Sequence, residues 1–139
     1  MDTLSPGQRS ELMAKVRAVD THPEIAVRKL VSRLGYRYHL HRKNLPGTPD
    51  LVFSGLKKVI FVHGCFWHQH HCPEGQRRPK SKKAFWAQKL ESNIRRDRHQ
   101  LLTLRRLGWH VLVIWECQTR AKHLENLAVR IQRFLDKQT

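Results

Sequence analysis

Residues 49–63 read PDLVFSGLKKVIFVH, two runs rich in β-branched and aromatic residues on either side of Ser54-Gly55. Such runs around a turn signal predict a β-hairpin, and we expect its strands at residues 50–53 and 58–63. The hairpin begins at Asp50 and ends at His63, so polar side chains stand at the strand ends. We expect this hairpin to lie in the middle of a sheet.

Helical patterns flank the hairpin on both sides. Upstream, Thr21 and Glu24 have the spacing of a capping box and Gly35 is a typical C-terminal stop, which predicts a helix over residues 21–35. Residues 36–40 alternate as in a strand. Downstream, the longest helical candidate covers residues 83–107, with an apolar stripe formed by Phe85, Leu90, Ile94, Leu101 and Leu104.

Residues 109–115 form an almost unbroken apolar run, as expected of a strand that is covered on both faces. A last helix is predicted from apolar residues at helical spacing between 124 and 134. The resulting order, α-β-β-β-α-β-α, predicts an α/β fold with a mixed central sheet flanked by helices.

Composition limits the class of protein. The chain has 139 residues, 40% of them hydrophobic, which suits one domain with its own core. It has no apolar stretch of about 20 residues and no signal-peptide core, so we expect neither a membrane-spanning nor a secreted protein. Three cysteines, an odd number, argue against a disulfide framework and favour the reducing cytoplasm.

Positive charge is unusually high and unevenly distributed. The 27 Lys+Arg and 11 Asp+Glu give a formal net charge of +16, and residues 73–108 hold half of it, with 11 basic residues against three acids (11 − 3 = +8). Clustered Lys and Arg favour nucleic acid as the partner, because phosphate contacts need cations on one face. A solvated helix face, ribosome binding and membrane-surface binding are the alternatives. Residues 1–20 read as an arm that presents Arg9, Lys15 and Arg17.

Cysteine and histidine concentrate in residues 63–72, which read HGCFWHQHHC. Zinc favours thiolate and imidazole ligands in sets of four, and this segment supplies Cys65, His70 and Cys72. Cys117, at the end of the predicted strand 109–115, is the fourth candidate. His71 could replace His70, and chance clustering is the alternative to a metal site.

A second constellation joins the two ends of the hairpin. Hydrolysis of a phosphodiester needs a hard divalent cation on oxygen ligands, which Asp50 and the backbone carbonyl of Val62 could supply. A Pro-Asp pair alone is usually turn chemistry, so its interest lies in the histidines opposite. His63 and His68 are not needed for zinc and could act as general acid and base near neutral pH.

The motifs LPGTPD at 45–50, VHGCFWHQHHC at 62–72 and WEC at 115–117 resemble the very short patch repair (Vsr) mismatch endonucleases. The likeness runs from about residue 13 to residue 120. It implies the restriction-endonuclease-like fold of the PD-(D/E)xK superfamily, with residues 21–139 as a single nuclease domain. It also implies nicking beside the thymine of a T:G mismatch, with catalytic Mg2+, structural Zn2+, and 5′-phosphate and 3′-hydroxyl products.

Carried over by position, the resemblance assigns site residues. Asp50 becomes the magnesium ligand, His63 and His68 the catalytic histidines, and Glu24 the partner of His68. The zinc ligands become Cys65, His70, Cys72 and Cys117. The (D/E)xK half of the superfamily motif is replaced by Phe61-Val62-His63, so no second carboxylate is supplied there.

The resemblance also implies how DNA is held. Phe66, Trp67 and Trp86 match aromatic residues that wedge into the base stack, and we expect the zinc-braced loop to hold this wedge outward. The expected phosphate contacts are those of the arm over residues 1–20 and of four cations near the long helix, Lys82, Lys83, Arg95 and Arg96. Charge thus predicts affinity and salt dependence, whereas specificity rests on the wedge and on Asp50.

The expected partner is double-stranded DNA containing a T:G mismatch, in the bacterial cytoplasm at the nucleoid. Mismatch-repair proteins are further partners that the family implies, and a single cut in one strand suggests a monomer. Two alternatives stay open: a non-catalytic zinc-dependent DNA-binding module, and a related nuclease with a different target.

Overall fold

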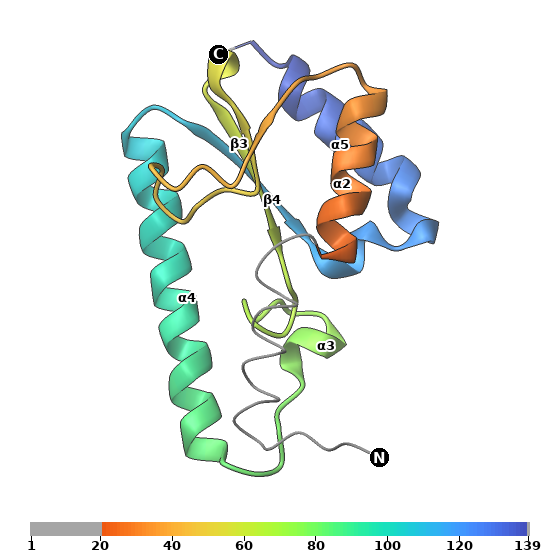
Figure 1. Cartoon of the computed structure of the whole chain (residues 1–139). Coiled ribbons are helices and arrows are strands. Elements are labelled where there is room, and N and C mark those ends of the chain that lie inside the picture. The colour runs from red at the N-terminus through yellow and green to blue at the C-terminus, as the bar shows by residue number, and fades with distance from the viewer. Residues whose placement is uncertain (1–20, 139) are drawn as a thin grey trace, which may run out of the picture.

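The computed structural model describes residues 21–138. Its helices and strands follow the predicted order, with one short additional helix (Figure 1). They are α2 (His22–Arg33), β1 (His39–Leu40), β2 (Leu51–Phe53), β3 (Lys58–His63), α3 (Pro73–Gln76), α4 (Lys83–Arg106), β4 (His110–Trp115) and α5 (Leu124–Asp136).

The four strands form one mixed sheet in the order β1-β2-β3-β4. The predicted hairpin is confirmed, with β2 antiparallel to β3 and Leu51 opposite Ile60. β3 and β4 are parallel, from Lys58 opposite His110 to His63 opposite Trp115. Because parallel strands end at the same edge, the residues that follow β3 and β4 are brought together there.

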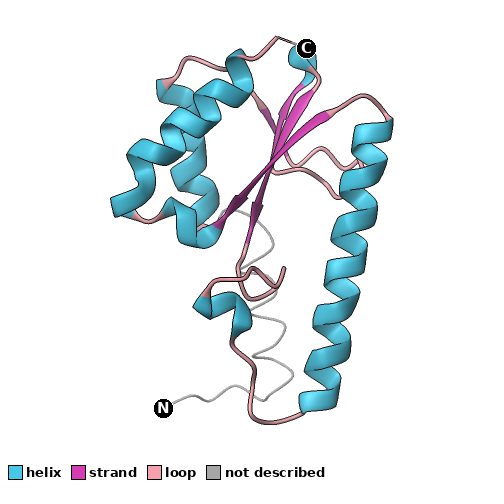
Figure 2. Ribbon diagram, turned by 180° about the vertical axis from the view of Figure 1, so that it is seen from behind, coloured by secondary structure: helices cyan, strands magenta, loops and turns pink. Residues whose placement is uncertain are grey.

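Helices cover both faces of the sheet (Figures 1 and 2). Side chains alternate between faces along a strand, so Ile60 packs with α2 and α5 while Val59 and Phe61 pack with Leu104 of α4. The predicted start of α2 is confirmed, since Thr21 Oγ1 accepts from the Glu24 N–H at 3.3 Å. Gly35 ends this helix with a φ of +87°, a conformation that other residues rarely adopt.

Two strand predictions need correction. Only residues 39–40 of the predicted strand 36–40 are paired, because the register of His39 with Val52 would place Arg37 opposite Ser54, where β2 has already turned. The strand at 109–115 has apolar side chains packed on both faces, Val111 and Val113 toward α4 and Leu112 and Ile114 toward α2 and α5. The cover is less complete than predicted, because β4 is an outer strand of the described sheet and only Ile114 is fully buried.

The long helix α4 extends past the carboxyl ends of β3 and β4 (Figure 1). Of its predicted apolar stripe, Leu90 and Leu104 are buried, whereas Phe85 is 57% exposed because the first turns lie beyond the sheet. None of the helices in the described part of the chain combines the length and apolarity needed to cross a bilayer.

Candidate active site

Three clusters of metal-binding or proton-transferring side chains lie near the edge where β3 and β4 end. Within residues 21–138, each cluster brings its donor atoms within 4.8 Å of one another. The cysteine cluster consists of Cys65, His70, Cys72 and Cys117. The histidine cluster consists of His63, His68 and Asp97, and the carboxylate cluster of Glu24, His41 and Asp50.

The carboxylate cluster draws on three elements. Asp50 immediately precedes β2, and its Oδ2 accepts the backbone N–H of Val62 on β3 at 2.6 Å. Glu24 comes from the first turn of α2, and its Oε2 lies 3.0 Å from Arg28 Nη2 and 3.3 Å from His41 Nε2. His41 follows β1, and its Nε2 lies 3.8 Å from Asp50 Oδ1.

The electrostatics of this cluster suit a divalent cation. Burial and the neighbouring Glu24 carboxylate raise the pKa of Asp50 to about 8, although the Val62 N–H opposes the shift. Two neighbouring carboxylates that are largely buried repel each other when both are ionised, and both lose hydration. A cation between them would remove both costs, and carboxylate oxygen is the ligand that Mg2+ prefers.

The histidine cluster stacks two imidazoles. The rings of His63 and His68 are nearly parallel, with centroids 3.8 Å apart. His68 Nδ1 donates to Asp97 Oδ2 of α4 at 2.5 Å, which fixes the orientation of the ring. Burial, followed by the proximity of His68, lowers the pKa of His63 to about 3, so His63 is neutral at physiological pH.

Two residues of these clusters were missed by sequence reasoning, and one expected pairing is wrong. The carboxylate beside His68 is Asp97, not Glu24, which instead contacts Arg28 and His41. One sequence feature could have pointed to Asp97: it is an acid within the basic run Arg95-Arg96-Asp97-Arg98, and a face that only binds phosphate does not need one. No sequence feature pointed to His41, because its loop carries no recognisable motif.

The cysteine cluster has the dimensions of a tetrahedral metal site. His70 Nδ1 lies 3.9 Å from Cys65 Sγ and 3.6 Å from Cys117 Sγ. Ligands at zinc–sulfur and zinc–nitrogen bond lengths in a tetrahedron are about 3.6 Å apart. All three cysteines are free of disulfides, and the four predicted zinc ligands are therefore arranged in a way that fits the ion.

Local structure explains this arrangement. Cys72 caps α3, which packs so closely that a Cβ on Gly75 would lie 1.8 Å from the carbonyl oxygen of His70. His71 is exposed and lies outside the cluster. Trp115 of β4 stacks on His70 with ring centroids 4.3 Å apart and meets His63 edge-on at 5.3 Å, so it stands between the cysteine and histidine clusters.

The aromatic wedge is folded inward in this conformation. Phe66 is 5% exposed, which corrects the expectation that the loop holds the Phe66-Trp67 pair outward. Its ring contacts those of Trp67 and Trp86, with centroids 5.3 and 5.7 Å away, and the Arg77 guanidinium lies 5.0 Å from its centre. Trp67 and Trp86 are half-buried, so the three rings cover one another.

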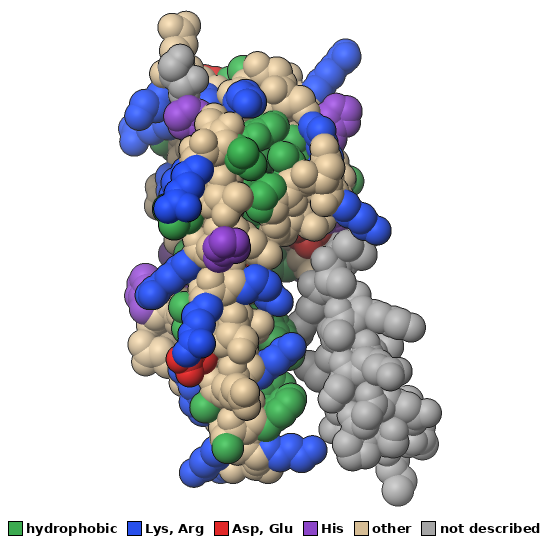
Figure 3. Space-filling model, turned by 90° about the vertical axis from the view of Figure 1, so that its left-hand side faces the viewer, with side chains coloured by type: hydrophobic (Ala, Val, Ile, Leu, Met, Phe, Trp, Pro, Cys, Tyr) green, Lys and Arg blue, Asp and Glu red, His purple; other side chains and the backbone are tan. Residues whose placement is uncertain are grey.

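Basic residues are displayed along α4. Lys and Arg side chains follow its length in the view that faces this helix (Figure 3). Lys82, Lys83, Arg95 and Arg96 are all exposed, although Arg95 also pairs with Glu91. The arm with its predicted contacts Arg9, Lys15 and Arg17 lies outside the described residues.

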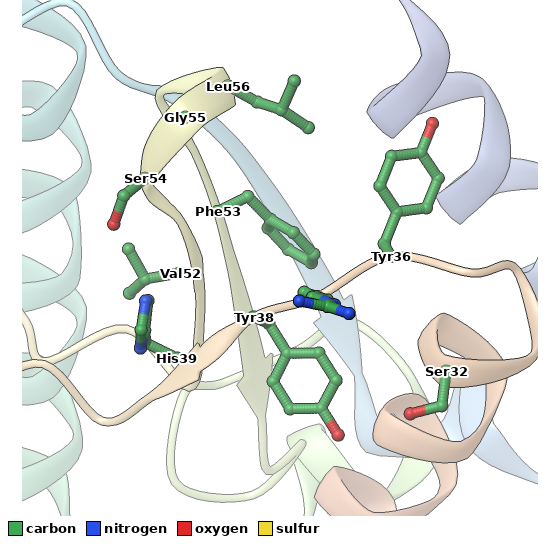
Figure 4. Close-up of a pocket in the computed structure, with 10 residues that line it drawn as sticks. Ser32, Tyr36, Tyr38, His39, Val52, Phe53, Ser54, Gly55 and Leu56 are labelled. Atoms are coloured by element: carbon green, nitrogen blue, oxygen red, sulfur yellow. The ribbon is translucent and has the colours of Figure 1, made fainter.

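One hollow in the described part of the chain lies away from the three clusters. It has a volume of about 910 Å³ and is lined by Tyr36, Tyr38 and Phe53 among others (Figure 4). No member of the three clusters lines it. We place the candidate chemistry where the titratable groups converge, at the ends of β3 and β4.

Comparison with known proteins identifies the family. The family described as DNA mismatch endonuclease Vsr matches residues 1–74. A type II nicking enzyme from Xanthomonas oryzae pv. oryzae, V.XorIIP, is 48% identical over 135 residues, which cover 97% of each chain. The DNA mismatch endonuclease Vsr of Escherichia coli K12 is 35% identical over 137 residues, 96% of this chain and 87% of the relative.

A third relative, the type II nicking enzyme V.NmeAIP of Neisseria meningitidis, is 40% identical over 87% of this chain and 86% of its own. The enzymatic interpretation is therefore preferred over a non-catalytic DNA-binding module. The chain is a DNA endonuclease and belongs to the Vsr family of DNA mismatch endonucleases.

Proposed function

We propose that the protein is a magnesium-dependent endonuclease that nicks one strand of DNA beside the thymine of a T:G mismatch and leaves a 5′-phosphate and a 3′-hydroxyl. The observation that carries this proposal is that a largely buried carboxylate, Asp50, and an oriented imidazole, His68, converge near the ends of β3 and β4. Metal-assisted phosphodiester hydrolysis needs both a cation-binding oxygen and a group that moves protons.

Asp50 and Val62 would hold the cation. Asp50 Oδ2 accepts the Val62 N–H, and Oδ1 lies 3.8 Å from His41 Nε2 on the side of Glu24. A strand residue directs its N–H and carbonyl to the same neighbouring strand, so the Val62 carbonyl faces the side of Asp50. When bound, Mg2+ would supply positive charge against the charge that develops on the phosphate.

His68 is the proposed proton-transfer group. Its side chain is 21% exposed, and the Asp97 carboxylate holds the Nδ1–H, which leaves Nε2 to accept a proton from the attacking water. The water oxygen bonds to phosphorus while the bond from phosphorus to the 3′ oxygen breaks, and a proton from solvent converts the departing 3′ oxygen into the hydroxyl. His63, buried and neutral, would fix the stacked ring of His68.

Mismatch preference would come from Phe66, Trp67 and Trp86. In the conformation described, Phe66 lies under Arg77, so insertion requires the guanidinium to move away, and a DNA phosphate offers it an alternative partner. Insertion between base steps costs a few kcal/mol and costs least where stacking is already imperfect, as at a T:G wobble.

The remaining assignments concern the wider complex. We infer that the zinc ion holds the loop that carries Phe66 and Trp67, that the arm over residues 1–20 contacts DNA, and that α4 binds phosphates. One cut in one strand needs one active site, which favours a monomer acting on bacterial DNA. Mismatch-repair proteins stay a family-based proposal for further partners.

A duplex panel tests the proposed function. Wild-type protein is incubated with matched, T:G and other mismatched duplexes, each with and without Mg2+, and each strand is end-labelled. We expect cleavage of the T-containing strand of the T:G duplex alone, only with Mg2+, and ends that ligase can reseal. Varying the bases that flank the mismatch also tests a different target, which the type II nicking enzymes among the relatives make a specific alternative. Equal cleavage of matched duplexes would refute mismatch specificity.

A further inference from the structure

We propose that His41 is a ligand of the catalytic cation, so that the site is a chelate of two carboxylates and one imidazole that favours Mn2+ over Mg2+. This inference rests on the proposed function, because it assumes that a cation binds at Asp50. It adds a nitrogen donor to the proposed Asp50 and Val62 ligands, and it changes the metal preference expected of the enzyme.

The first argument is the direction of the donor atoms. His41 Nε2 lies 3.3 Å from Glu24 Oε2 and 3.8 Å from Asp50 Oδ1. Neighbouring donors around an octahedral ion with bonds of about 2.1 Å are about 3 Å apart. The observed separations therefore leave room for an ion among the three atoms after a small inward movement.

The second argument is that both carboxylates are held in place by neighbouring groups. Asp50 Oδ2 is bound to the Val62 N–H, which directs Oδ1 toward His41. Glu24 is 3% exposed, and Arg28 lies beside the same oxygen that faces His41. A carboxylate oxygen has two lone pairs, so Oε2 can accept from Arg28 and also bind a cation.

The third argument concerns the backbone of His41. Its φ is +48°, a region that residues with side chains seldom occupy, and its N–H donates to the carbonyl oxygen of Asp50 at 3.3 Å. This contact ties the imidazole to the same backbone segment as the carboxylate. Four other described residues with side chains share a positive φ, so this contact, and not the φ value alone, supports the role given to His41.

The ligand set determines the metal preference. Mg2+ takes oxygen ligands and keeps several waters, whereas imidazole suits first-row transition metals. Loss of His41 should therefore weaken Mn2+ binding far more than Mg2+ binding. Glu24 and Asp50 would bind either ion.

Mn2+ binding to the zinc-loaded protein, followed by electron paramagnetic resonance, tests the proposal. We compare wild type, His41→Gln and His41→Asn, the last because asparagine tolerates a positive φ and is too short to replace the imidazole. His39→Gln is the matched control, since His39 is an exposed histidine two residues away that lies outside the clusters. Circular dichroism checks that each variant is folded.

In wild type and His39→Gln we expect a nitrogen coupling to the bound Mn2+. Both His41 variants should lose this coupling and bind Mn2+ about tenfold or more weakly, with Mg2+ affinity changed less than about threefold. An unchanged coupling in the His41 variants would overturn the proposal. Asp50→Asn distinguishes failure of the proposed metal position from failure of the His41 assignment. If Asp50→Asn binds Mn2+ like wild type, the proposed metal position is wrong. If Asp50→Asn loses Mn2+ but the His41 variants do not, only the assignment of His41 is wrong.

Discussion

The cysteine cluster and the carboxylate cluster both lie near the ends of β3 and β4, but they differ in how far apart their donor residues are in the sequence. The cysteine cluster takes three donors from one eight-residue segment, residues 65–72, and one from the end of β4. The carboxylate cluster takes single donors from α2, the loop after β1 and the start of β2. Soft donors close together in the sequence suit an ion that holds a loop, whereas hard donors from separate elements suit one that acts on a substrate.

Because of this difference, we expect removal of each cluster to affect the fold differently. Loss of the cysteine cluster should release the loop that carries Phe66 and Trp67 and therefore affect folding. Loss of the carboxylate cluster should leave the fold intact, because burial of Asp50 beside Glu24 is unfavourable without a cation. The histidine cluster, with Trp115 between it and His70, lies where the two regions meet.

Asp50→Asn gives the largest expected effect on activity. We expect nicking of a T:G duplex to fall by about a thousandfold or more, since the cation loses its charged ligand. Affinity for the duplex, measured by fluorescence anisotropy, should stay within a few-fold. Retention of more than a tenth of wild-type activity would contradict the role given to Asp50.

The same variant has a predicted pH signature in stability. The pKa of Asp50 is raised from 3.8 to about 8, so its favourable contribution is present below pH 4 and is lost as the pH rises toward 8. Without added Mg2+, Asp50→Asn should therefore melt at a higher temperature than wild type at pH 8, and the difference should shrink toward pH 4. A lower melting temperature at pH 8 would mean that Asp50 is mainly structural.

Cys117→Ser tests the structural role expected of the cysteine cluster. We expect the zinc content to fall from one equivalent to almost none and the stability to fall by about 3 kcal/mol or more, or roughly 10 °C in melting temperature. His71→Gln is the matched control, because His71 adjoins His70 but lies outside the cluster. Zinc loss in His71→Gln rather than in a His70 variant would reassign the ligand.

Sequence reasoning found the cysteine cluster more completely than the other two for the same structural reason. Cys65, His70 and Cys72 are close in the chain, so their spacing is visible before folding. Asp97 meets His68 only because α4 packs against the loop after β3, 29 residues away, and His41 meets Glu24 only because β1 joins the sheet. The resemblance assigned Glu24 to His68, and the packing of α4 puts Asp97 there instead.

The fold shows the same division between local and non-local information. The hairpin was predictable because β-branched runs and Ser54-Gly55 are local signals. The shortness of β1 and the exposure of β4 depend on where neighbouring strands end and on which strand lies at the edge. The inward position of Phe66 was hidden for a related reason, since it depends on contacts with Trp86 and Arg77.

Asp97→Asn should have a smaller effect than Asp50→Asn. We expect kcat to fall by about 10- to 100-fold, because the amide no longer fixes the tautomer and orientation of His68. Removing an acid from the basic helix should at the same time leave duplex affinity unchanged or tighter. Glu91→Gln removes an exposed acid from the same helix and should leave kcat unchanged. Equal effects of both variants on kcat would show that Asp97 acts only through its charge.

Lys83→Gln gives the smallest expected effect. It tests whether the positive charge of α4 contributes only to DNA affinity, separately from the three clusters. Lys83 is exposed at the start of α4 and belongs to none of the three clusters. If it contacts a phosphate, its loss lowers the slope of log affinity against log salt by about 0.9 and weakens T:G and matched duplexes alike. Lys122→Gln removes the same charge from the turn before α5 and should leave the slope unchanged. A change confined to the T:G duplex would instead mean that Lys83 contributes to mismatch recognition, and that affinity and specificity are not divided between α4 and the clusters.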